Sequence, residues 1–112
     1  MQILDLEVVS QLREMLGDDI DELFDDLLQL VPEELSAMAL CAQSGDLECV
    51  EHKAHQIKGS SANLGVLSFA EACRKLEEGL RRGEIQDPTL QLNTLTEQFA
   101  LATQAIRALS GP

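Results

Sequence analysis

The residues best suited to chemistry in this 112-residue chain are His55, Lys58 and Gly59. Side chains three and four residues apart are neighbours on a helix surface, so in a helix both Lys58 and Gly59 would lie beside the imidazole of His55. Helical side chains lean toward the N-terminus, which brings the Lys58 ammonium back toward the ring. Gly59 leaves bare backbone there, although glycine inside a helix costs about 1 kcal/mol relative to alanine. A ring nucleophile, a cation and free space suit a phosphoryl group that is carried on His55 and presented to a partner protein.

The helix that must position these residues has a continuous apolar seam. Its members are four, three, four and three residues apart: Val50, Ala54, Ile57, Ser61 and Leu64. This spacing is typical of one buried face of a packed helix. Because His55 follows Ala54, it points roughly 100° away from the centre of the seam. We therefore expect the imidazole to be at least partly in water.

The run AHQIKGSSANLG, from Ala54 to Gly65, resembles the motif of the histidine-containing phosphotransfer (HPt) domains of multistep two-component phosphorelays. The family pattern is roughly A-H-x-L-K-G-x-x-x-x-L-G, and Ile57 here replaces the commoner leucine. The resemblance covers nearly the whole chain in length and helix order. It implies a phosphorelay carrier: Nε2 of His55 accepts a phosphoryl group from the aspartyl phosphate of a receiver domain and passes it to the aspartate of another response-regulator receiver.

The resemblance also implies which residues support the site. The matching position on the next helix falls on Glu77, where some members carry glutamine. A carboxylate there would hold Nδ1–H of His55 and stabilise the neutral tautomer; the alternative is an exposed glutamate without a role. Arg81, one turn further on, is expected to help attract phosphate. Candidates for a docking surface lie around the motif: Glu51, His52 and Ala62.

The expected partners are receiver domains of response regulators and a hybrid sensor kinase, as the resemblance implies. The sequence has no Walker loop, kinase signature or Gly-rich nucleotide loop, and no Ser/His/Asp set can be argued. We therefore predict a covalent phosphocarrier rather than an enzyme. No cofactor is expected on this chain, because the receiver supplies Mg²⁺ and most of the transition-state stabilisation.

Three other interpretations of these residues stay open. His52 is a rival phosphoacceptor, but the residues three and four positions after it are His55 and Gln56 rather than a lysine and a glycine. His52 and His55, with Glu51, would make a partial metal site. Because H-x-x-H without further ligands is a weak zinc signal, we predict no metal. The chain could also be a helical module that binds a partner without phosphotransfer.

Net charge and its distribution restrict the partners. A charge of −12 argues against binding to nucleic acids or anionic membranes. The acidic run from Asp18 to Asp26 lacks a calcium-loop pattern and is expected to be a solvated helix face. Six of the eight Lys and Arg residues lie between positions 53 and 82. They are either ordinary surface charge or a local positive field around a phosphorylated His55.

Cellular context is predicted from cysteines and the chain start. The three cysteines, Cys41, Cys49 and Cys73, are irregularly spaced, so we expect reduced, mostly buried thiols in a cytoplasmic protein. No signal peptide or transmembrane stretch is found. A chain that begins with Met and holds one domain favours a stand-alone protein, and the lack of a long apolar patch favours a monomer.

Composition and periodicity predict an all-α fold in a single domain, residues 1–112. Five helices are expected: from about Leu6 to Leu16, from Asp18 or Asp19 to Gly45, from Asp46 to about Leu64, from Ser68 to Gly83, and from Asp87 onward, with a frayed end at 110–112. The second is expected to be one helix kinked at Pro32, beginning with a cap that involves Glu22. The fourth has an S-x-x-E capping box, Ser68 and Glu71. Short connections imply an antiparallel up-down four-helix bundle of the last four helices, capped by the short first helix.

Overall fold

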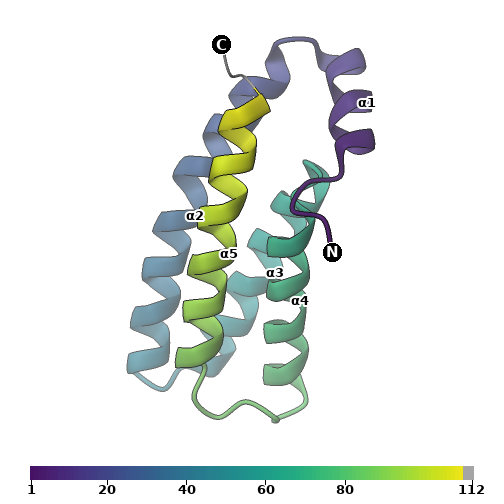
Figure 1. The fold of residues 1–112 in the computed structure, drawn as a ribbon. Helices are drawn as coiled ribbons and strands as arrows, with labels where there is room; N and C mark the ends of the chain where they lie inside the picture. The colour runs from purple at the N-terminus through teal and green to yellow at the C-terminus, as the bar shows by residue number, and fades with distance from the viewer. Residues whose placement is uncertain (110–112) are drawn as a thin grey trace.

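The computed structural model describes residues 1–109, and the predicted frayed end at 110–112 lies outside this part. Over residues 1–109 the chain forms five α-helices: α1 (Leu6–Leu16), α2 (Asp19–Gln43), α3 (Leu47–Asn63), α4 (Leu67–Arg81) and α5 (Thr89–Leu109). Helices α2 to α5 form an up-down bundle, and α1 lies at one end of it (Figure 1). The predicted fold class is confirmed.

The core lies between the four long helices, and each of them packs against two others in the order α2, α3, α4, α5 and back to α2. All five residues of the predicted α3 seam are buried. Phe69 of α4 meets Phe99 of α5 edge to face, with ring centroids 4.9 Å apart. The seam fixes the rotation of α3 about its axis and so decides which of its residues face solvent.

Helix α2 continues through Pro32 as one helix, as predicted, and the kink expected at the proline stays a prediction. The proline is exposed, whereas Leu27, Val31 and Met38 are buried in phase on either side of it. Burial of this face offsets the roughly 3 kcal/mol that a proline costs inside a helix. The predicted capping arrangement at the start of α2 is wrong, because Asp18 occupies the N-cap position but its side chain makes no capping hydrogen bond.

Short backbone contacts join the N-terminus to the turn between α3 and α4. Asp5 N–H donates to the Gly65 carbonyl at 2.7 Å, and Leu67 N–H donates to the Ile3 carbonyl at 2.9 Å. Asp5 also caps α1, as predicted, because its side chain accepts the amides of Glu7 and Val8. Helix α1 is thereby attached beside the turn that orients α3 against α4.

The predicted capping box of Ser68 and Glu71 is not formed. Helix α4 begins at Leu67, and its N-cap residue is Val66, whose side chain makes no capping hydrogen bond. The Leu67 amide is satisfied by Ile3 instead, and the Glu71 carboxylate binds Arg74. A long-range backbone contact has therefore replaced the local cap.

The cysteines differ from the prediction that all three are reduced. Cys41, in the last turn of α2, and Cys49, in the first turn of α3, form a disulfide with Cα atoms 6.0 Å apart. The pair meets because α3 folds back on α2. Cys73 is free and buried. Burial, together with the nearby charge of Glu77, raises the pKa of its thiol to about 12, so Cys73 is an unreactive core residue.

Within residues 1–109, no helix has both the length and the apolar character needed to cross a membrane.

Candidate functional site

The candidate site lies on the α3–α4 hairpin and is built from side chains of both helices. The α3 seam buries Ala54 and Ile57 completely or nearly so. His55 is thereby turned outward, and its side chain is 62% exposed, in agreement with the prediction from helical spacing.

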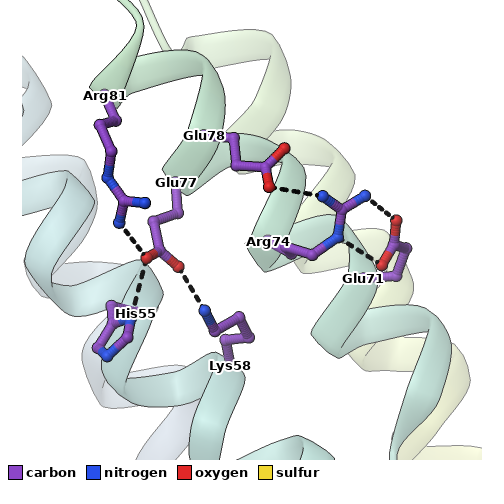
Figure 2. A network of polar contacts seen from close by, with 7 residues as sticks. All are labelled: His55, Lys58, Glu71, Arg74, Glu77, Glu78 and Arg81. Carbon is purple, nitrogen blue, oxygen red and sulfur yellow. Dashed lines mark hydrogen bonds and ion pairs between the residues drawn. The ribbon is translucent and has the colours of Figure 1, made fainter.

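Glu77 of α4 is the centre of the site (Figure 2). Its side chain is only 3% exposed. Its Oε1 lies 2.9 Å from Nδ1 of His55 and 2.5 Å from Nη2 of Arg81, which donates to it. Its Oε2 accepts a hydrogen bond of 2.8 Å from Nζ of Lys58. One buried carboxylate therefore binds an imidazole, an ammonium and a guanidinium.

The ionisation of Glu77 decides which ring nitrogen of His55 is free. Burial by itself would raise the pKa of Glu77, but hydrogen bonds from Lys58, His55 and Arg81 outweigh it and hold the pKa at about 2. An ionised carboxylate has no proton to donate, so Nδ1 of a neutral His55 must carry the hydrogen of this contact. Nε2 is then left with its lone pair on the exposed side of the ring.

The surface beside His55 is open at Gly59. A Cβ atom added there would meet nothing within 4 Å. Next to it is a shallow, mostly apolar hollow of about 370 Å³ on the α3–α4 face. Residues that line it include Lys58, Gly59, Ala62, Leu67 and Ala70. The site thus combines a nucleophilic nitrogen with room for a second molecule.

The other predicted site residues lie at the edge of this cluster. Glu51 joins it through Arg81, with 3.7 Å between Oε2 of Glu51 and Nε of Arg81. Ala62 is exposed beside the hollow. His52 is exposed on α3 but, among the described residues, makes no polar contact with the cluster. Residues 1–109 contain no group of three or more His, Cys, Asp or Glu side chains arranged to hold a metal ion.

Of the two interpretations of the basic segment, ordinary surface charge or a positive field around His55, the ion pairs favour the first. Lys58 and Arg81 are both bound to Glu77. The pairing extends to Lys53, which binds Glu34 at 3.1 Å, and to Arg74, which binds Glu71 and Glu78 (Figure 2). Most of the basic residues in this segment are therefore balanced by carboxylates.

Sequence reasoning missed that Lys58 and Arg81 share one carboxylate. The spacing of Glu77 and Arg81, four residues apart on one helix, was a usable signal for an ion pair. Lys58 and Glu77 lie on different helices, and no sequence pattern fixes the rotation of α3 against α4. The contact between His55 and Glu77 that the resemblance implied is present.

Comparison with known proteins agrees with this geometry. The family model described as "Hpt domain" matches residues 7–109. The crystal structure of histidine-containing phosphotransfer protein B (HptB) from Pseudomonas aeruginosa PAO1 is similar, with a TM-score of 0.89 and 31% sequence identity. The match covers 95% of this chain and 92% of that protein. Among curated protein sequences, none matches this chain significantly. The family match over nearly the full chain and the similarity to HptB place this protein in the Hpt domain family.

Proposed function

We propose that this protein is a phosphorelay carrier whose phosphoacceptor is Nε2 of His55. The donor would be the aspartyl phosphate of one receiver domain and the acceptor the aspartate of another response regulator. The observation that carries the proposal is the contact of Nδ1 with Glu77 at 2.9 Å on a side chain that is 62% exposed. In a neutral ring this contact places the hydrogen on Nδ1 and leaves the lone pair on Nε2.

In the proposed forward step, the lone pair of Nε2 attacks the phosphorus of the aspartyl phosphate. The bond between phosphorus and the aspartate oxygen breaks, and its electron pair stays on the aspartate. Nδ1 of His55 keeps its proton, held by Glu77. In the reverse direction the same groups return the phosphoryl group to an aspartate. This chain supplies a fixed nucleophile, and Mg²⁺ is expected on the receiver rather than here.

Lys58 and Arg81 are the proposed support for phosphate charge. Both already lie at the carboxylate that holds His55, and their side chains are 28% and 60% exposed. A phosphoryl group adds a charge of about −1.5 to −2 near pH 7. Lys58 in particular would be drawn from Glu77 toward it, because lysine acts as a mobile point charge.

We propose that the receiver docks over Gly59 and the neighbouring hollow, with Glu51, His52 and Ala62 at its margin. The open space at Gly59 supports this placement. We further propose that the protein is a monomer in the cytoplasm and that a hybrid sensor kinase supplies its phosphate. In that compartment the disulfide of Cys41 and Cys49 would be reduced.

The proposal is tested by relay between two receivers. A phosphorylated receiver, freed of its kinase, is mixed with this protein and a second receiver of different mass, and phosphate on each chain is followed by intact mass spectrometry at neutral or alkaline pH. Phosphate should reach the second receiver only when this protein is present. Tight binding without any transfer, to several receivers, would instead favour a helical interaction module.

A further inference from the structure

We propose that Cys41 and Cys49 are a reversible thiol–disulfide pair, which exchanges with low-molecular-weight disulfides and locks the α2–α3 corner (residues 41–49) when it is oxidised. The structure joins the pair by a disulfide between the last turn of α2 and the first turn of α3. This inference goes beyond the proposed function and does not depend on phosphorylation of His55. In the proposed cytoplasmic location, the pair would be a dithiol until the surrounding thiol pool becomes oxidising.

The α2–α3 corner holds the two cysteines together through contacts that involve no sulfur. Asp46 binds the backbones of both: its N–H donates to the Cys41 carbonyl at 2.9 Å, and its Oδ1 accepts the Cys49 amide at 3.1 Å. The hydroxyl of Ser44 also donates to the Cys41 carbonyl, at 3.0 Å. The Cα atoms of the two cysteines are 6.0 Å apart, within the usual range for a disulfide. The corner is therefore preorganised for disulfide formation when the sulfurs are reduced.

The pair lies at the edge of the bundle, in contrast to the third cysteine. Cys41 and Cys49 are half-buried, and residues 43–46 between them are exposed. Cys73 is completely buried, and burial raises the pKa of its thiol to about 12. Because the thiolate is the nucleophile in exchange, Cys73 does not compete with the pair.

Oxidation takes place in two exchange steps with the small disulfide. In the first, the thiolate of one cysteine attacks a sulfur of the small disulfide, forms a mixed disulfide and releases one small thiolate. In the second, the thiolate of the other cysteine attacks the protein sulfur of the mixed disulfide, forms the bond between Cys41 and Cys49, and releases the second small thiolate. Each protein thiol gives its proton to the solvent. The pair loses two electrons, the small disulfide gains them, and the reverse steps restore the dithiol.

The bond and the fold stabilise each other by the same factor, because linkage is reciprocal. The two cysteines are 8 residues apart in the sequence, so the bond closes a short loop in the unfolded chain. The entropy of closing a loop of this size makes the disulfide roughly 100-fold more favourable in the folded protein than in the unfolded chain. Oxidation should therefore raise the ratio of folded to unfolded protein by that factor.

The α2–α3 corner lies apart from the proposed phosphoryl-transfer site, at the end of the bundle opposite α1 (Figure 1). Cys49 precedes His55 by six residues, which is about 9 Å along the axis of α3. Cys49 is bonded to α2, whereas His55 contacts Glu77 of α4. The hollow beside Gly59 is lined by neither cysteine of the pair. Oxidation should therefore protect the protein from unfolding without covering the surface around His55.

The first test is a redox titration of the full chain. Reduced protein is equilibrated in buffers of oxidised and reduced glutathione, with and without urea that unfolds it, and its thiols are trapped by alkylation and assigned by peptide mass spectrometry. The bond between Cys41 and Cys49 should form in the folded protein at a roughly 100-fold lower ratio of oxidised glutathione to the square of reduced glutathione than in urea. Excess reduced glutathione should remove it. Equal midpoints, glutathione mixed disulfides as the final product, or a bond that excess glutathione leaves intact would overturn the inference.

Variants of Asp46 test whether the corner is preorganised. Asp46→Ala removes the oxygen that accepts the Cys49 amide, whereas Asp46→Asn keeps a capping oxygen. In the same titration the folded Asp46→Ala variant should need up to about fivefold more oxidised glutathione, and Asp46→Asn should follow wild type. A wild-type midpoint in Asp46→Ala would show that the corner does not hold the pair in advance.

The effect on stability is measured by thermal denaturation of the oxidised and reduced protein. The oxidised form should melt about 10 °C higher. The matched control carries both Cys41→Ser and Cys49→Ser, and its melting temperature should be the same in oxidising and reducing buffers. Equal melting temperatures of oxidised and reduced wild type would overturn the proposed stabilisation. Phosphoryl transfer that is lost only in the oxidised form would overturn the claim that the surface around His55 stays free.

Discussion

The buried carboxylate of Glu77 accepts a hydrogen bond of 2.9 Å from Nδ1 of the exposed His55, and this contact joins α4 to α3 at the proposed phosphoryl-transfer site. The carboxylate is held in place by two cations as well, so it orients the ring without depending on the solvent. This contact and the helix packing around it lead to predictions that can be measured.

The first prediction concerns the stability of the protein at low pH. The pKa of Glu77 is lowered from 4.5 to about 2 in the folded protein. A lowered carboxyl pKa stabilises the fold above the pKa of the unfolded chain, and this stabilisation is lost as pH falls toward the folded value. The difference in unfolding free energy between wild type and Glu77→Gln should therefore shrink by about 3 kcal/mol between pH 5 and pH 2. Urea denaturation over this pH range measures the difference in unfolding free energy. A difference that does not vary with pH would show that the neighbouring Lys58, His55 and Arg81 do not hold Glu77 ionised.

The second concerns Gly59. A side chain there has free space in the isolated protein, so Gly59→Gln should fold and gain up to about 1 kcal/mol of helix stability. The longer side chain would lie beside His55 and occupy the docking surface. Transfer from a phosphorylated receiver should be blocked, whereas Gly59→Ala, the matched control, should transfer at close to the wild-type rate. Normal transfer by Gly59→Gln would show that this glycine is not needed for access.

The third concerns Gly65, where α3 turns into α4. Its φ is +77°, and an added Cβ would lie 3.1 Å from the Asp5 carbonyl oxygen and 3.3 Å from Cγ1 of Val8. Gly83 has a similar φ of +70° but open space around it. Gly65→Ala and Gly83→Ala each place a side chain on a left-handed backbone, which costs about 1–2 kcal/mol of stability. Gly65→Ala should lose at least about 1 kcal/mol more of unfolding free energy because of the close contact. Equal losses of stability in the two variants, measured by thermal denaturation, would mean that the N-terminal segment moves away from the added methyl group at no cost.

The fourth concerns Ser61 in the α3 seam. This residue is fully buried, and its hydroxyl has no hydrogen-bond partner among the described residues. Removing an unpaired buried hydroxyl should stabilise the protein, so Ser61→Ala is expected to raise the unfolding free energy by about 1 kcal/mol. Ser60→Ala is the control, because Ser60 bonds the Gln56 carbonyl near the surface and should be almost neutral. Destabilisation by Ser61→Ala would indicate that the hydroxyl is satisfied in solution.

Sequence patterns predicted the helices well where caps and apolar periodicity are local. Helix α1 has the predicted bounds, and α3 begins after the predicted cap Asp46, which accepts the Cys49 amide. The start of α4 was misplaced because a distant residue, Ile3, satisfies its first amide. Contacts between residues far apart in the chain leave no periodic pattern in the sequence. The prediction of a Ser68–Glu71 capping box at the start of α4 failed for that reason.

The site was predictable in part. Helical spacing placed Lys58 and Gly59 beside His55 and turned the imidazole outward, and the structure agrees. The contact with Glu77 was expected from the family resemblance, since spacing along one helix says nothing about its neighbour. The sharing of Glu77 by Lys58 and Arg81 depends on the packing of α3 against α4 and became visible only in three dimensions.

The most direct test of the proposed phosphocarrier function is the location of the phosphate. Wild type, His55→Gln and His52→Gln are incubated with a phosphorylated receiver at alkaline pH and analysed by intact and peptide mass spectrometry. His52 and His55 are both exposed, so both variants should keep the circular-dichroism spectrum of wild type. One phosphate should be found on His55 in wild type and in His52→Gln, and none in His55→Gln. Phosphate on His52, or undiminished phosphorylation of His55→Gln, would contradict this prediction.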